Sequence, residues 1–317
     1  ETIAANAFSA CDSITELQLP KTIKTIGNYA FSDCKELMSI TIPEGVAEIG
    51  DCSFMNCSGL ISLSMPKSVV KIGGAAFSGC KGLKQVVLPA VAVSGGKVSS
   101  KFPDSYMSIT NIVVHDSVKS LSNGVFSGCS GLENLVLPFV GRERGGRWAG
   151  TEYSLFGYVF GTGSAPGMMS VKQYYSSDSS RTYYIPSSLK SVAITDETVI
   201  GYGAFSGCGG LMSVTIPSSV TSIGENAFSG CSGLTSVTIP SSVEFIKSGA
   251  FAACSSLTNM VLPFVGRERG GACAGREYAG TEYSLFGYVF GTSSASSMIP
   301  VNQYYSSSAS KTYYIPS

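Results

Sequence analysis

Residues 30–50 read AFSDCKELMSITIPEGVAEIG, and the spacing of their apolar side chains changes once along this stretch. From Phe31 to Ile40 the apolar positions come at intervals of three, whereas Ile42 follows Ile40 by two. An interval of three suits a tight helical turn, and an interval of two suits a short strand whose alternate side chains face inward. The stretch therefore predicts one coil built from a turn, a strand and a return segment.

This pattern recurs along the chain with a spacing of 23 residues inside each uninterrupted run. In every match a Phe is followed three residues later by a Cys and nine residues after that by a Pro. A coil of this size cannot bury its apolar side alone, so we predict that successive coils stack and share one core. The eight matches begin at Phe8, Phe31, Phe54, Phe77, Phe126, Phe205, Phe228 and Phe251.

The proline and glycine columns place the ends of the segments within a coil. Pro43 has no N–H to give to a neighbouring coil, so the strand predicted at residues 40–42 ends there. Gly50 follows an Ile where the chain turns back. We predict an α/β solenoid of ten coils, with short strands in one long parallel sheet and short helical or 3-10 turns on the other face.

A second, longer repeat lies over the first. The sequence TEYSLFGYVFG at residues 151–161 is identical to residues 281–291, and both copies finish with TYYIPS. About fifty residues are too many for a structureless loop, so we expect each copy to fold against the solenoid. We predict a single solenoid over residues 1–317, with coils at 1–138 and 187–263 and duplicated insert modules at 139–186 and 264–317.

Residues 227–243, AFSGCSGLTSVTIPSSV, resemble the repeat unit of the BspA-like leucine-rich-repeat family, AFxxCxxLxxIxIPxxVxxIG. The resemblance covers residues 1–138 and 187–263, with a degenerate coil at 90–124 in which we expect neither the Phe nor the Cys. The inserts, with their FGYVFG and YYIPS motifs, resemble a module found within such arrays in gut bacteria. The resemblance implies a right-handed leucine-rich-repeat coil in a secreted or cell-surface protein that attaches to host proteins, other microbes or extracellular matrix. It implies no particular binding residues.

Charge and hydropathy exclude several classes of partner. Lys plus Arg and Asp plus Glu are both 21, so no net field attracts nucleic acid or an anionic membrane. The most apolar stretch, residues 86–93, is far shorter than the roughly 20 residues that cross a bilayer, so we expect no membrane insertion. Glu1 opens within a repeat and the chain contains no signal-peptide pattern, so we expect a piece of a longer protein.

Catalytic and metal chemistry have little support in the sequence. Eight of the ten cysteines fall in the Cys column and read as core residues, while Cys52 and Cys273 lie off it. The single histidine, His115, stands where other coils carry the Pro, and we interpret it as a surface corner residue. A nucleophilic triad would need that imidazole, and no nucleophile motif accompanies it. We expect no enzyme activity, no metal and no cofactor.

Two groups of residues are candidates for binding. The first is a hydroxyl-rich, uncharged strip on the exposed side of the sheet, although Ser and Thr are also what any exposed strand tolerates. The second is the group of paired tyrosines in the inserts, because tyrosine is enriched at interfaces; half of them could instead pack each insert onto the solenoid. The strip comprises Ser39, Thr41, Ser62, Ser64, Ser213, Thr215, Ser236 and Thr238, and the tyrosines are Tyr174, Tyr175, Tyr183, Tyr184, Tyr304, Tyr305, Tyr313 and Tyr314.

Arginines add a third candidate. Arg142 and Arg144, repeated as Arg267 and Arg269, could hold an acidic partner through bidentate contacts, or could be solvated loop residues. Together these features favour a non-catalytic interaction or adhesion protein that binds proteins or glycans of a host or neighbouring microbe. The alternative is a structural spacer or self-associating stalk that presents another domain.

Overall fold

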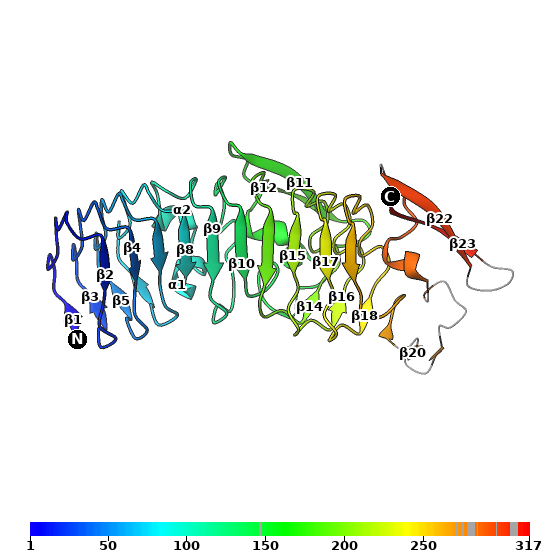
Figure 1. Cartoon of the computed structure of the whole chain (residues 1–317), viewed down its shortest axis with the longest axis horizontal. Helices are drawn as coiled ribbons and strands as arrows, with labels where there is room; N and C mark the ends of the chain where they lie inside the picture. Colours follow the sequence, from blue (N-terminus) through cyan, green and yellow to red (C-terminus); the bar gives the residue numbers. More distant parts are fainter. Residues whose placement is uncertain are drawn as a thin grey trace. The chain divides into compact units, whose positions relative to one another are not determined.

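The computed structural model describes residues 1–145, 148–269, 272–273, 276–277, 283, 285–295, 297–304 and 310–317. The chain forms two compact units, and both draw on the first insert. Unit 1 comprises Glu1–Pro138, Val159–Met169 and Tyr184–Leu189, and unit 2 comprises Phe139–Tyr158, Ser170–Tyr183 and Lys190–Ser317. Each unit is a stack of short parallel strands, which confirms the predicted solenoid class (Figure 1).

In unit 1, one strand from each coil joins a parallel sheet, and the strands pair in chain order. The register keeps equivalent residues side by side: Ile40 pairs with Leu17 on one side and with Leu63 on the other. These three side chains point into the core, while their strand neighbours point out. The strands are β2 (Glu16–Gln18), β4 (Ser39–Thr41), β6 (Ser62–Ser64), β8 (Gln85–Leu88), β9 (Asn111–Val114) and β10 (Asn134–Leu137).

A second parallel ladder in unit 1 was not predicted. Its two-residue strands lie where the chain turns back, just before the glycine column, and Ile26 pairs with Ile49. The ladder forms because each return segment lies above the same segment of the next coil. Its strands are β1 (Thr2–Ile3), β3 (Thr25–Ile26), β5 (Glu48–Ile49) and β7 (Lys71–Ile72), and the unit also holds α1 (Ala90–Val93) and α2 (Val98–Lys101).

Unit 2 repeats this plan with fewer coils. Its main parallel run again aligns Ser with Ser and Val with Val, as in the pairing of Ser213 with Ser191 and of Val214 with Val192. The main run contains β13 (Ser191–Ile194), β15 (Ser213–Thr215), β17 (Ser236–Thr238) and β19 (Asn259–Val261), and the second ladder contains β14 (Val199–Ile200), β16 (Ser222–Ile223) and β18 (Phe245–Ile246).

Each insert contributes a 3-10 turn and an antiparallel hairpin. The FGYV sequence forms the 3-10 turn in both copies, and the YYIP sequence forms the second strand of the hairpin. The first insert contains η1 (Glu152–Ser154), η2 (Phe156–Val159), β11 (Met168–Tyr174) and β12 (Ser180–Pro186). The second contains β20 (Ala272–Cys273), β21 (Arg276–Glu277), η5 (Phe286–Val289), β22 (Met298–Tyr304) and β23 (Ser310–Pro316).

The phenylalanine column is the centre of the core. In unit 1, Phe31 and Phe54 stack with ring centroids 5.2 Å apart, and in unit 2 Phe205 and Phe228 do the same at 5.2 Å. The expectation that residues 90–124 lack the Phe was wrong. Phe102, directly after α2, is fully buried and stacks on Phe77 at 5.3 Å. A short helix thus brings a Phe into the column without the usual spacing.

Candidate binding surface

The predicted hydroxyl strip of unit 1 lies on the outward side of β4 and β6. Ser39 and Thr41 are exposed, while Ser62 and Ser64 are half-buried. They form two columns because the parallel register places Ser39 beside Ser62 and Thr41 beside Ser64. A groove of about 690 Å³, open to solvent, lies over this face and is lined by three of these four residues together with the charged Glu16, Lys21 and Glu44.

The corresponding strip of unit 2 is uncharged throughout. Ser213, Thr215, Ser236 and Thr238 are all exposed, and Ser213 lies beside Ser236 in the register. These four residues line a groove of about 510 Å³ whose other walls are Val214, Ile216, Ser218, Val237 and Pro240.

His115 belongs to the groove of unit 1, which the sequence did not indicate. Its Nε2 lies 2.9 Å from the carbonyl oxygen of Met65, two coils away, and its backbone N–H donates to Leu88 at 3.1 Å. A proline at this position could not donate that second bond, so the substitution of His for Pro extends the ladder by one residue. The imidazole is half-buried at the groove wall.

Beyond β6 the outward column of unit 1 becomes apolar. Val87 and Val136 are half-buried, and Val113 is 37% exposed. The neighbouring column stays polar, with Asn134 donating to Asn111 at 2.8 Å along the stack. The outward face therefore changes from hydroxyl-bearing to mixed amide and aliphatic along one unit.

The paired tyrosines divide into buried and exposed members. Tyr174 is 40% exposed, whereas Tyr183 is fully buried, as is its counterpart Tyr313. The two buried tyrosines are core residues, so their place among the candidate contact residues is corrected. Tyr175, Tyr184 and Tyr314 are half-buried, Tyr304 is described by its backbone position in β22 alone, and Tyr305 lies outside the described residues.

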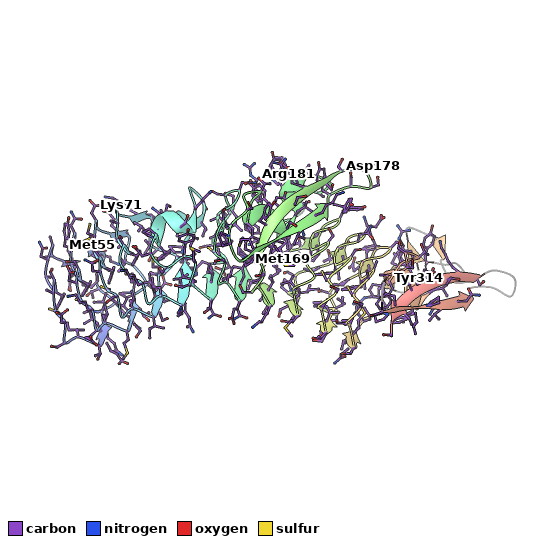
Figure 2. The ribbon with its side chains drawn as sticks, turned by 90° about the horizontal axis from the view of Figure 1, so that it is seen from above. Met55, Lys71, Met169, Asp178, Arg181 and Tyr314 are labelled. Atoms are coloured by element: carbon purple, nitrogen blue, oxygen red, sulfur yellow. The ribbon has the colours of Figure 1, made fainter. Side chains whose placement is uncertain are left out.

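Tyr183 is held at both ends. Its ring lies directly over Gly157, where a β-carbon would overlap it, and its hydroxyl donates to the carbonyl of Glu152 at 3.1 Å. Burial raises the pKa of the phenol. The same hairpin carries Arg181, whose guanidinium lies 2.7 Å from the Glu152 carboxylate; Figure 2 labels Arg181 with Asp178 on this hairpin and Tyr314 on β23.

Two of the four arginine candidates, Arg142 and Arg144, contact other residues of unit 2. Arg142 lies over the Trp148 ring at 5.2 Å and near Tyr153 at 5.6 Å, which is a cation–π arrangement. Arg144 forms an ion pair with Asp196. Each guanidinium has an intramolecular partner and is also part-exposed, at 40% for Arg142 and 36% for Arg144, so the acidic-partner and solvated-loop interpretations both stay predictions.

Glu197 anchors the start of the first insert, and no sequence signal pointed to it. Its buried carboxylate accepts backbone N–H bonds from Gly145 at 2.8 Å, Thr198 at 2.8 Å and Val140 at 3.3 Å. Burial raises the pKa of this carboxyl, and the backbone donors oppose that rise. The group thus fixes an insert loop to the coil that follows it.

The cysteine column is buried as predicted for a core column, apart from half-buried Cys11. Burial raises the pKa of Cys34 to about 11 and those of Cys129 and Cys254 to about 12, so these thiols are poor nucleophiles. Cys52 is half-buried, and the Cys273 side chain lies outside the described residues. Over the described ranges, no group of three or more His, Cys, Asp or Glu side chains could hold a metal ion.

Stacked parallel strands, a turn on the opposite side and a recurring Phe, Cys and Leu in most coils define a leucine-rich-repeat protein. The sequence profile described as BspA type Leucine rich repeat region matches residues 1–133 and 178–268 in six copies. The chain belongs to this family, which confirms the resemblance; the insert module is not part of that finding. None of the helices in the described residues is long and apolar enough to cross a bilayer.

Solved structures with the same repeat type are similar at low identity. A leucine-rich repeat protein from Bacteroides ovatus is 23% identical, with 83% of this chain and 76% of that chain covered and a TM-score of 0.33. A leucine rich cell surface protein from Faecalibacterium prausnitzii is 24% identical, with 82% of each chain covered and a TM-score of 0.33. The leucine-rich repeat protein of T. pallidum is 22% identical, with coverages of 74% and 71% and a TM-score of 0.29. No curated protein matches the sequence.

Proposed function

We propose that this chain is a non-catalytic interaction protein, secreted or displayed at a cell surface, that binds a protein or glycan of a host or neighbouring microbe along the outward face of its strands. Family membership supports a role in protein interaction. The observation that carries the proposal is that grooves in both units lie over the outward Ser and Thr columns.

The chemistry of these columns suits an extended polar ligand. Ser and Thr hydroxyls both donate and accept hydrogen bonds, so one column can follow a polypeptide backbone or a sugar chain. In unit 2 the columns contain no charged residue, so binding there depends on short-range contacts and little on electrostatic steering. We therefore expect the affinity of the unit 2 groove to change little with ionic strength.

The first insert adds an aromatic contact of a different kind. Tyr174 is exposed, and the Lys172 ammonium lies 5.1 Å from the centre of its ring. An exposed tyrosine with a neighbouring cation fits a secondary contact on a protein or glycan partner. Tyr183 supports the hairpin from below and is not part of this contact.

The test begins with the intact chain on an array of host proteins, extracellular-matrix proteins and glycans. The Thr215→Lys/Thr238→Lys variant is then measured against each ligand found. We expect at least about tenfold weaker binding, because an unpaired ammonium buried in an interface costs more than about 1.4 kcal/mol. Thr221→Lys is the matched control: Thr221 is also exposed and precedes β16 in the second ladder.

Each outcome decides between the candidate functions. Loss of binding in the double variant with normal binding of Thr221→Lys supports the strand face of unit 2 as the contact. Loss in Tyr174→Ala alone would move the contact to the insert. Absence of any ligand on the array, together with concentration-dependent self-association in sedimentation, would contradict the proposal and favour the spacer.

A further inference from the structure

In unit 2, the coil that contains Phe205 packs against the η2 side of the first insert through a defined set of hydrogen bonds and a ring contact. The Phe156 N–H donates to the carbonyl of Ala204 at 2.8 Å, and the Phe156 ring packs on Phe205 with centroids 4.9 Å apart. Gln173, fully buried, accepts from Gly157 N at 2.6 Å. Its amide donates to the carbonyls of Ala204 at 3.2 Å and Ser206 at 3.1 Å.

The second insert builds the same face but leaves it open. Gln303 accepts from Gly287 N at 2.8 Å, as Gln173 does in the first copy. Yet Phe286 is 37% exposed where Phe156 is fully buried, and within the described part of the chain the Gln303 amide nitrogen has no acceptor. A recess of about 240 Å³ opens there, lined by Leu257, Thr258, Asn259, Met260, Phe286, Phe290, Ile315 and Pro316.

The residue two before the column Phe indicates which coils can pack against this face of an insert. This residue has a left-handed backbone in all eight repeats that match the Phe, Cys and Pro spacing, with φ of 54° at Asn226 and 57° at Gly203. Since Asn, Tyr, Cys and Ala all occupy this position elsewhere, the backbone does not require glycine. Glycine occurs only in the coils that meet an insert, at Gly124, Gly203 and Gly249.

At Gly203 the reason is close approach of the hairpin backbone rather than backbone freedom. A β-carbon on Gly203 would overlap the carbonyl oxygen of Tyr174 in the first hairpin. A β-carbon on Gly207 would lie only 3.1 Å from the Lys172 carbonyl oxygen and 3.3 Å from Val171. The docked coil therefore has glycine both two residues before and two residues after its Phe.

We propose that the open face of the second insert, formed by Phe286, Gln303 and the recess beside them, is a docking site for a further leucine-rich-repeat coil with the sequence Gly-Ala-Phe-Ser-Gly-Cys. The first insert already holds this sequence, at residues 203–208, on the equivalent face. The inserts are thus adaptors that join coils, and the glycine two residues before the Phe is the main specificity determinant.

The same geometry argues against docking of the first coil of a second copy. That coil reads Asn6-Ala-Phe-Ser-Ala10-Cys, so it offers Ala7 and Phe8 in the right places. However, Asn6 and Ala10 replace the two glycines, and their side chains would meet the hairpin backbone. We expect the chain to be monomeric.

The first experiment supplies the coil directly, by extending the chain after Ser317 with a second copy of residues 188–263. Hydrogen exchange at the Phe286 amide should slow by at least about 100-fold, as for an amide that gains a buried partner, with the Phe156 amide as internal reference. In a matched extension whose first coil carries Asn in place of the glycine that corresponds to Gly203, the rate should stay within about threefold of the original. Equal protection by both extensions, or by neither, would overturn the proposal.

A second experiment uses the chain at its natural length. Asn6→Gly/Ala10→Gly should convert the monomer into a head-to-tail oligomer in sedimentation, and adding Phe286→Asp should restore the monomer. The proposal fails if the glycine variant stays monomeric, or if the unsubstituted chain already associates through this face.

Discussion

The thiol of Cys57 donates a hydrogen bond to the backbone carbonyl of Phe31, at an Sγ–O distance of 3.1 Å. Phe31 precedes it by 26 residues, so this bond joins two neighbouring coils inside the core. A cysteine serves here because it is small and apolar enough for a core column and still has a donor, which gives the Phe31 carbonyl a second hydrogen bond beside the one from the Cys34 N–H at 3.4 Å. The same bond joins Cys34 to Phe8, Cys80 to Phe54, Cys231 to Phe205 and Cys254 to Phe228.

Cys57→Ala should lower the free energy of unfolding by roughly 1–3 kcal/mol, because it leaves a small void and removes one of the two hydrogen bonds to the buried Phe31 carbonyl. Urea titration followed by circular dichroism measures the change. Cys52→Ala is the control, since Ala75 already holds the equivalent left-handed position one coil later, and it should cost less than about 0.5 kcal/mol. Equal losses in both variants would mean that the column thiols contribute nothing specific.

Alkaline pH should destabilise the chain through the same column. Burial raises the pKa of Cys129 and of Cys254 from 9.0 to about 12, and it also raises the pKa of Tyr183. Above pH 9 the unfolded chain loses these thiol protons while the folded chain keeps them. The free energy of unfolding is therefore unaffected by the ionisation of these thiols below pH 9 and decreases as the pH rises towards 12. The slope is at most about 1.4 kcal/mol per pH unit for each thiol.

Urea midpoints between pH 8 and pH 11 provide the measurement. Cys129→Ala/Cys254→Ala should show a shallower decrease than the parent chain, because two of the titrating groups are gone. A midpoint that stays constant or rises up to pH 11 would show that the thiols ionise in the folded state.

The repeat architecture followed from the sequence because its determinants are local and periodic. The column of Phe31 and its equivalents, the buried cysteines and the outward Ser and Thr positions all follow from spacing within one coil. The strand predicted at 40–42 lies at Ser39–Thr41, although the Ile42 N–H still donates to Ser64 at 3.0 Å, so the ladder does run to the residue before the proline.

What the sequence could not show depends on contacts between distant segments. Alternation along the strand requires that Tyr183 and Tyr184 face opposite sides of β12. Which of the two is buried, however, depends on how the hairpin lies against η2. The pairing of Arg144 with Asp196 joins residues 52 apart. The position of Phe102 could not be predicted for a similar reason: α2 places it in the Phe column, and the repeat spacing does not predict α2.

The tyrosines allow a direct comparison of buried and exposed aromatic residues on one hairpin. Tyr183→Ala should lower the free energy of unfolding by roughly 3–5 kcal/mol, because it removes a buried ring and the bond to Glu152. Tyr174→Ala should cost less than about 1 kcal/mol. Thermal and urea unfolding measure both, and comparable losses would show that the hairpin surface is not divided in this way. Binding studies of the insert should therefore substitute Tyr174 and leave Tyr183 unchanged.

Glycine at the junction between insert and coil supplies the sharpest test of how the first insert is held. Gly203→Ala should lower the free energy of unfolding by roughly 2–4 kcal/mol, because the added methyl group meets the Tyr174 carbonyl oxygen and alanine is strained in a left-handed backbone. Asn226→Ala places the same residue in the same backbone conformation one coil later, away from any hairpin, and should cost at most about 1 kcal/mol. Urea titration of the two variants isolates the contact with the insert from the backbone strain. If both lose the same stability, Gly203 is present for its conformation alone, and the insert does not select the coil that packs on it.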